Sequence, residues 1–130
     1  MRSRQLKRVL VVEDDPDIRA VVELTLSELG RLTVSTSASG PEALEAAESF
    51  TPDVILLDVM MPGMDGVETL RELKSRAATA SIPVIFLTAR IQPHETSQYL
   101  SLGSIGVIAK PFDPLTFNET VVALWKEHAG

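Results

Sequence analysis

Short apolar runs alternate with longer amphipathic stretches along the chain, and this alternation constrains the fold more than any other feature. Three of the five runs are almost continuously apolar, as expected of parallel strands that are covered on both faces. The runs span Val9–Val12, Leu32–Val34, Val54–Leu57, Ile82–Leu87 and Ile105–Ala109. The second is short and polar enough to predict an edge strand. The pattern therefore predicts an α/β fold, in which a strand and a helix repeat five times and helices cover both faces of a doubly wound parallel sheet.

The stretches between the runs carry apolar residues at helical spacing and recognisable end signals. Ser39 followed by Pro41, and Asp113 followed by Pro114, are each typical of a capping residue and the first helical turn. Gly30 stands where the first helix should end. The predicted apolar faces run from Ile18 to Leu29, from Ala43 to Phe50, from Val67 to Ala77, from Pro93 to Leu102 and from Phe117 to Trp125.

Composition narrows the class of protein. A chain of 130 residues with 45% apolar residues is long enough for one domain with its own core, which we place at residues 8–130 after a basic, solvated extension at residues 1–7. Four of the 12 basic residues lie in the first eight positions, so the rest carries 8 against 18 acidic ones and is a poor partner for nucleic acid. The absence of cysteine excludes thiolate chemistry. No apolar run suggests a membrane span or a signal peptide, so we expect a cytoplasmic protein.

Four of the predicted strands end in polar or charged residues. Glu13 and Asp14 follow the first strand, Asp58 the third, Thr88 the fourth and Lys110 the fifth. In an open α/β sheet, ligands bind in the crevice outside the carboxyl ends of the strands. Chance placement on a solvated loop explains polar residues at any one strand end, but explains all four strand ends together poorly. The sequence therefore predicts one functional site at this edge.

The residue types suggest the chemistry of that site. Glu13, Asp14 and Asp58 would repel one another unless a proton or a cation neutralised them, and a hard cation with oxygen ligands, Mg²⁺ first, fits best. Lys110 offers a point charge and Thr88 a hydroxyl to a phosphoryl group. A carboxylate can also act as the nucleophile and form an acyl phosphate. We therefore expect a phosphoaccepting aspartate, and Asp58 is the most central candidate.

Four segments in order carry a family resemblance: VLVVEDDPDIR from Val9, VILLDVMMPGMDG from Val54, PVIFLTA from Pro83 and KPF from Lys110. Together they resemble the receiver domain of two-component response regulators, in a match that runs from about Arg8 to the end. The resemblance implies a flavodoxin-like, five-stranded parallel sheet in the order 2-1-3-4-5. It also implies signal transduction within a two-component system or phosphorelay.

The resemblance implies a role for each site residue. Asp58 would accept a phosphoryl group from a phosphohistidine on a sensor histidine kinase or a histidine phosphotransfer protein. Lys110 would contact that group across a cis bond to Pro111, and Thr88 would be the switch hydroxyl. The domain would catalyse its own phosphoryl uptake and slow autodephosphorylation, which stops short of a conventional enzyme.

The resemblance likewise implies a Mg²⁺ site. Asp14 would bind the ion directly and Glu13 through water, Asp58 would be a further metal residue, and the backbone carbonyl of Met60 would supply another oxygen. Met60 and Arg90 would flank the path of the hydrolytic water.

One position departs from the family pattern and keeps a second function open. Val107 stands where the family usually has an aromatic residue that moves behind the threonine. The main hypothesis is a single-domain response regulator that signals to an unknown protein target through phosphorylation-dependent contacts. The alternative is an interaction module that binds its partner without phosphorylation. A hydrolase of the haloacid-dehalogenase type is discounted, because Met60 occupies the position of its second acid. The face of the fourth helix, fifth strand and fifth helix is the candidate surface for a homodimer or a target.

Several other residues are expected to be structural. Asp53 and Asp65 are interpreted as turn residues, and Asp15 and Asp17 as caps of the first helix. We expect His94 and His128 on the surface, and Tyr99 and Trp125 in apolar packing.

Overall fold

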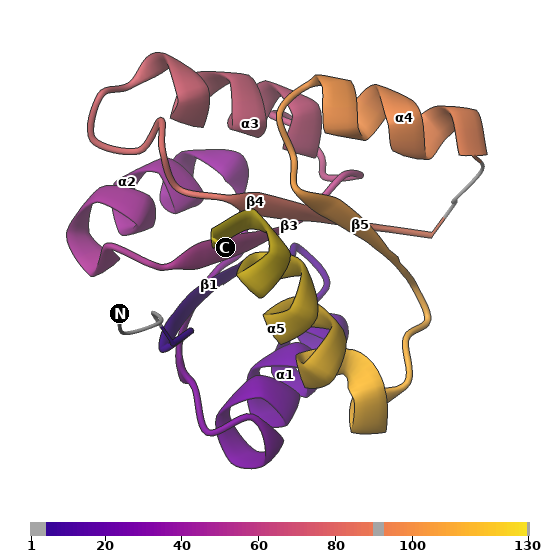
Figure 1. Ribbon diagram of the computed structural model, residues 1–130. Coiled ribbons are helices and arrows are strands. Elements are labelled where there is room, and N and C mark those ends of the chain that lie inside the picture. Colours follow the sequence, from indigo (N-terminus) through magenta and orange to yellow (C-terminus); the bar gives the residue numbers. More distant parts are fainter. Residues whose placement is uncertain (1–4, 90–92, 130) are drawn as a thin grey trace.

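The computed structural model describes residues 5–89 and 93–129, which form alternating strands and helices (Figure 1). The elements are β1 (Arg8–Val12), α1 (Pro16–Leu24), the π-helical segment η1 (Thr25–Leu29), β2 (Thr33–Ser37), α2 (Gly40–Phe50), β3 (Val54–Asp58), α3 (Gly66–Ser75), β4 (Val84–Thr88), α4 (Pro93–Ser101), β5 (Gly106–Ala109) and α5 (Pro114–Ala129). Arg2, Arg4 and Arg90 lie outside the described residues. No helix of the described part is long and apolar enough to cross a membrane.

The strands form one parallel sheet in the order β2-β1-β3-β4-β5, which confirms the predicted doubly wound α/β fold. β2 is an edge strand, as its composition predicted. Every residue of β3 and β4 is buried, and β1 is buried from Val9 onwards, so the continuously apolar runs are the strands covered on both faces. β3 is the middle strand and brings its last residue, Asp58, to the centre of the carboxyl edge.

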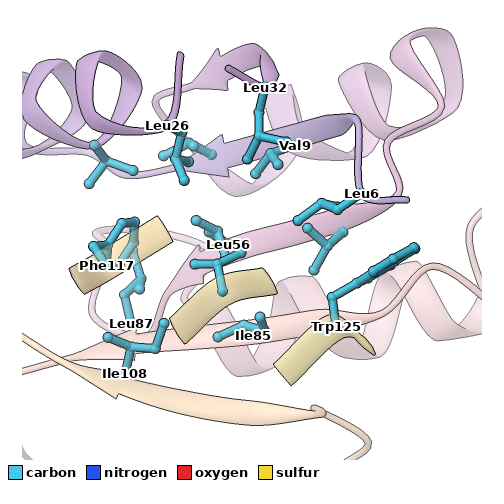
Figure 2. Packing of buried hydrophobic residues seen from close by; sticks show 14 residues of the cluster. Leu6, Val9, Leu26, Leu32, Leu56, Ile85, Leu87, Ile108, Phe117 and Trp125 are labelled. Carbon is cyan, nitrogen blue, oxygen red and sulfur yellow. The ribbon is translucent and has the colours of Figure 1, made fainter. Parts of the chain in front are cut away.

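Each face of the sheet carries its own core. On one face, helices α1 and α5 and segment η1 enclose a cluster that includes Leu26, Phe117 and Trp125, all nearly inaccessible to solvent (Figure 2). On the other face, α2, α3 and α4 pack over a cluster that includes Leu70 and Phe86, and the two groups of helices lie on opposite sides in Figure 1. Trp125 is thus a core residue, and Tyr99 is partly buried against Phe86 at 5.1 Å between ring centroids.

Local sequence signals place most helix starts correctly. Asp15 caps α1 through its side chain, and Ser39 caps α2. Asp65, expected only to be a turn residue, forms a reciprocal capping box with Glu68 at the start of α3. Asp113 accepts the backbone N–H of Leu115 at the start of α5. These caps bond amide groups that a helix leaves unpaired in its first turn. Each capping residue lies within three positions of the amide that it bonds, so the sequence signal is local.

Some expected helix boundaries are confirmed and others are wrong. The first helix changes to π-helical geometry at Thr25 but ends as expected, with Gly30 as its C-terminal cap at φ −85°. Arg31, rather than Gly30, takes the left-handed conformation, at φ 55°. The third helix ends at Ser75 instead of reaching Ala77, because Arg76 is already extended. Asp17 does not cap α1: its backbone N–H donates to Asp15 in the first turn.

Strand limits shift as well, in positions that local pattern does not specify. β2 begins after Leu32 and continues to Ser37, and β4 begins at Val84 rather than Ile82. The polar residues 35–37 pair with β1, which supplies ladder hydrogen bonds that hydrophobic patterning does not report. His94 and His128 are exposed, as expected.

Candidate functional site

Three acidic side chains meet at the carboxyl edge of the sheet. Glu13 and Asp14 follow β1, and Asp58 ends the neighbouring strand β3. One carboxylate oxygen from each lies within 4.8 Å of the others. Glu13 and Asp58 are buried, at 1% and 2% exposure, whereas Asp14 is more open to solvent. The structure therefore brings together the three carboxylates that the sequence placed at this edge.

Close packing of α3 against the end of β3 holds the position of Asp58. The backbone N–H of Gly66 donates to the carbonyl of Val59 at 2.9 Å, directly after Asp58. A Cβ at Gly66 would collide with the carbonyl oxygen of Asp58. Glycine is required here because two backbones approach one another closely, and this contact fixes the loop that follows the aspartate.

Lys110 is the cation of the site. Its Nζ lies 2.9 Å from Oε1 of Glu13 and 3.0 Å from Oδ1 of Asp58. Burial alone would lower the pKa of Lys110, but its hydrogen bonds to Glu13 and Asp58 outweigh that effect and raise the pKa above its ordinary value. The Lys110–Pro111 bond is cis. Lys110 is therefore a charged ammonium shared between two carboxylates.

The carboxylates carry more negative charge than Lys110 neutralises. Burial raises the pKa of Glu13 from 4.5 to about 7, the hydrogen bond from Lys110 acts in the opposite direction, and the nearby Asp58 raises this pKa further. A divalent cation with oxygen ligands would relieve this repulsion, and Mg²⁺ binds at open sites with one or two carboxylates. The donor set fits that ion: Glu13, Asp14 and Asp58 supply only oxygens, within reach of a single ion.

Thr88 ends β4, the strand next to the one that carries Asp58, and Met60 follows Asp58 by two residues. Thr88 is buried at the end of β4, one residue beyond Leu87, the register partner of Asp58. Its carbonyl accepts the backbone N–H of Lys110 at 2.8 Å, so the ends of β4 and β5 are tied together. Met60 donates its backbone N–H to Oδ1 of Asp58 at 3.4 Å, and its side chain is 74% exposed.

Comparison with known proteins identifies the family. A family model described as the response regulator receiver domain matches residues 9–122. The chain belongs to the response regulator receiver family.

Similar proteins agree with this assignment. The chain is 36% identical over 118 residues to the alkaline phosphatase synthesis transcriptional regulatory protein PhoP of Bacillus subtilis (strain 168), covering 91% of this chain and 48% of PhoP. It is 44% identical over 108 residues to the response regulator PleD of Caulobacter vibrioides, covering 82% of this chain and 23% of PleD. The structure of the chemotaxis protein CheY4 of Vibrio cholerae matches with a TM-score of 0.84 and 34% identity, covering 92% of this chain and 98% of that one.

The receiver domain thus spans less than half the length of these two curated relatives. Receiver domains take part in two-component signalling, interact with histidine kinases or phosphotransfer proteins, and generally bind Mg²⁺ at an acidic pocket. This receiver domain has an acidic group, formed by Glu13, Asp14 and Asp58, that could hold a metal ion.

Two contacts of the acidic loop were missed by sequence reasoning. The guanidinium of Arg19, in α1, donates from Nη1 to the backbone carbonyl of Glu13 at 2.8 Å. The carbonyl of Ser37, at the end of β2, accepts the backbone N–H of Glu13 at 3.1 Å. An arginine one helical turn after the cap Asp15 was a signal for the first contact, because residues 15 and 19 lie on the same side of a helix.

A mostly apolar cavity of about 520 Å³ opens beside Lys110. It lies between the first turns of α1 and the connection from β5 to α5. Its lining residues are Asp17, Ile18, Val21, Ala89, Lys110, Pro111, Phe112 and Pro114. Lys110 therefore borders both the carboxylates and an apolar surface, an arrangement that only the folded receiver domain reveals.

Proposed function

We propose that this receiver domain accepts a phosphoryl group onto Asp58 in a Mg²⁺-dependent reaction and, as a single-domain response regulator of the cytoplasm, signals through phosphorylation-dependent protein contacts. The observation that carries the proposal is the pair of contacts from one ammonium, Lys110 Nζ, to Glu13 and Asp58. This geometry holds a nucleophilic carboxylate beside a cation and next to two further acidic groups.

The reaction follows from the groups present. A carboxylate oxygen of Asp58 attacks the phosphorus of a phosphohistidine, an O–P bond forms, and the N–P bond breaks. The imidazole leaves with the electron pair of the broken bond and regains a proton from solvent. Lys110 contacts Oδ1 of Asp58 at 3.0 Å. When the negative charge passes from this carboxylate to the phosphoryl oxygens, the ammonium of Lys110 is close enough to follow the charge. Thr88 would donate its hydroxyl to one of those oxygens.

Glu13, Asp14, Asp58 and the backbone carbonyl of Met60 would hold Mg²⁺. When bound, the ion would neutralise charge on the transferring phosphoryl group and orient it toward Asp58. The geometry supports this assignment, because an oxygen from each of the three carboxylates lies within 4.8 Å of the others while Lys110 contacts only two of them.

The cavity beside Lys110 supports a protein as the physiological phosphodonor. A small phosphodonor does not need an apolar surface in order to bind, whereas a protein that presents a phosphohistidine must dock next to Asp58. Val21 at the cavity is 46% exposed, and Leu115 just beyond it is 74% exposed. This apolar surface suits a sensor histidine kinase or a histidine phosphotransfer protein.

A second candidate function rests on Val107. This side chain is partly buried, opposite Phe86 in the sheet register, and packs in the cluster that also contains Tyr99. A valine there has no aromatic ring to move behind Thr88. An interaction module that binds its partner equally well without phosphorylation is the alternative, and it is distinguished by partner affinity with and without a phosphoryl mimic at Asp58.

The proposal is tested by intact-protein mass spectrometry after incubation with Mg²⁺ and acetyl phosphate. We expect one phosphoryl adduct on the wild type and none on Asp58→Asn, whose fold should be retained or stabilised because one of three repelling carboxylates is removed. Adduct on both proteins would show that the acceptor is another residue. No adduct on the wild type, with Mg²⁺ binding confirmed, would favour the interaction module or a receiver that accepts only from its own partner.

A further inference from the structure

Arg19 is the second cation near the acidic cluster, and it contacts the backbone rather than a carboxylate. Its Nη1 donates to the carbonyl oxygen of Glu13 at 2.8 Å, whereas both ion pairs found at the site within the described residues are made by Lys110. Arg19 is partly buried in α1. The guanidinium therefore constrains the acidic loop without occupying an oxygen that a metal ion would need.

The loop that carries Glu13 and Asp14 is held through its backbone by two other elements. Glu13 lies one residue beyond the last ladder pairs of β1, which join Val12 to Ser37 and to Leu57. Its backbone N–H reaches Ser37 on the β2 side, and its carbonyl reaches Arg19 on the α1 side. The Glu13 peptide unit is thereby held from a strand and from a helix at once, just where the chain leaves the sheet.

A further contact within the loop orients the carboxylate of Glu13. Oε2 of Glu13 accepts the backbone N–H of Asp15 at 3.2 Å, and Asp15 begins α1 by capping it. The backbone N–H of Arg19 donates to the carbonyl of Asp15 at 2.9 Å. Glu13, Asp15 and Arg19 are therefore each bonded to the other two. Asp14 lies between Glu13 and Asp15 in the segment that these contacts hold.

We propose that Arg19 is a positioning residue of the phosphoacceptor site, which holds Glu13 and Asp14 in place for the divalent cation. This inference rests on the proposed function, since it assumes that these carboxylates bind Mg²⁺. The change in Mg²⁺ affinity expected on loss of Arg19 has the opposite sign to a simple charge effect. A nearby positive charge repels Mg²⁺, so loss of the charge alone would strengthen binding, whereas loss of the positioning contact weakens it.

The test compares Arg19→Met with Arg71→Met by isothermal titration calorimetry with MgCl₂. Both substitutions remove one positive charge, but Arg71 is an exposed residue of α3 away from the acidic loop. We expect Arg19→Met to bind Mg²⁺ about tenfold more weakly than the wild type, as is typical when a group that orients metal ligands is lost. Arg71→Met should match the wild type. The melting temperatures of the metal-free proteins should remain within a few degrees.

Two further measurements separate positioning from a structural role. In the acetyl phosphate assay, the Mg²⁺ concentration for half-maximal adduct formation should rise for Arg19→Met, while the rate at saturating Mg²⁺ stays near that of the wild type. Arg19→Gln, which keeps a donor without the charge, should recover part of the affinity, and it replaces the methionine variant if that protein fails to fold.

Each outcome bears on a separate statement. Equal or tighter Mg²⁺ binding by Arg19→Met and Arg19→Gln, with the wild type binding normally, would overturn the positioning role and leave the phosphoacceptor intact. A wild type that binds no Mg²⁺ would overturn the assigned metal site and the positioning role together.

Discussion

Both ends of the β-sheet carry the same residue types, a carboxylate near a basic side chain. The partners of the carboxylates differ between the two ends. At the amino end, Oδ2 of Asp53 accepts the backbone N–H groups of Lys7 and Arg8 at 3.1 and 2.9 Å. The guanidinium of Arg8 donates to the carbonyl of Phe50 and lies 4.1 Å from the centre of the Phe50 ring. Nε1 of Trp125 donates to the backbone carbonyl of Asp53.

At the carboxyl end, the carboxylates lie close to one another and to an ammonium group, and the backbone N–H groups that they accept come from nearby residues, Asp15 and Met60. Glu13, Asp14 and Asp58 crowd within 4.8 Å, and Lys110 is shared by two of them. The Asp53 end ties the start of β1 to the connection before β3 and to α5, whereas the Asp58 end keeps charge that the protein does not balance. The difference separates two uses of a carboxylate: one that accepts backbone N–H groups from a neighbouring strand ties segments of the fold together, and crowded carboxylates are suited to a cation or a phosphoryl group.

The largest expected change in stability comes from Lys110→Ala. Removal of the ammonium leaves two buried carboxylates without their partner, so the free energy of unfolding of the metal-free protein should fall by about 3 kcal/mol. Saturating Mg²⁺ should recover much of this loss, and Mg²⁺ binding itself should persist while the response to phosphorylation weakens. Chemical denaturation with and without Mg²⁺ measures the effect, with Lys126→Ala, an exposed lysine of α5, as the control. Loss of metal binding in Lys110→Ala would contradict the roles assigned to the site.

Asp53→Ala should have a smaller effect that does not depend on Mg²⁺. The substitution removes the acceptor of two backbone N–H groups, one of them partly buried, and should cost about 1–2 kcal/mol in the free energy of unfolding. Acetyl phosphate should still label the variant to the wild-type extent. Reduced labelling of a folded Asp53→Ala protein would show that the two ends of the sheet are coupled, against the comparison drawn above.

The last expected effect is a change in the slope of the unfolding free energy with pH. Because the pKa of Glu13 is raised to about 7 from 4.5, the folded protein binds a proton there that the unfolded chain has lost. The stability that this proton contributes is complete below about pH 4.5 and disappears as the pH rises through about 7. In EDTA, the unfolding free energy of the wild type should therefore fall relative to that of Glu13→Gln as the pH rises from 5.5 to 7.5. Parallel pH profiles for the two proteins would show that Glu13 titrates normally.

The sequence predicted the site more completely than it predicted the boundaries of the elements. Glu13, Asp14, Asp58 and Lys110 were each placed by one rule, that parallel strands bring their carboxyl ends to the same edge, and the structure brings them together. The end of α3 and the π-helical turn of η1 were missed. Helix ends depend on small differences between local hydrogen-bonding options, which hydrophobic periodicity does not report.

The amino-acid sequence by itself determined the alternation of strands and helices, the buried central strands and the caps at Asp15, Ser39 and Asp113, because these signals act within a few residues along the chain. Only the tertiary structure decided that Arg19 holds the carbonyl of Glu13, that Asp53 ties the start of β1 to the connection before β3, and that a cavity opens beside Lys110. Arg8 meets Asp53 across 45 positions of sequence, and Trp125 meets Asp53 across 72. Such contacts depend on how each helix is rotated and packed on the sheet, which no local pattern encodes.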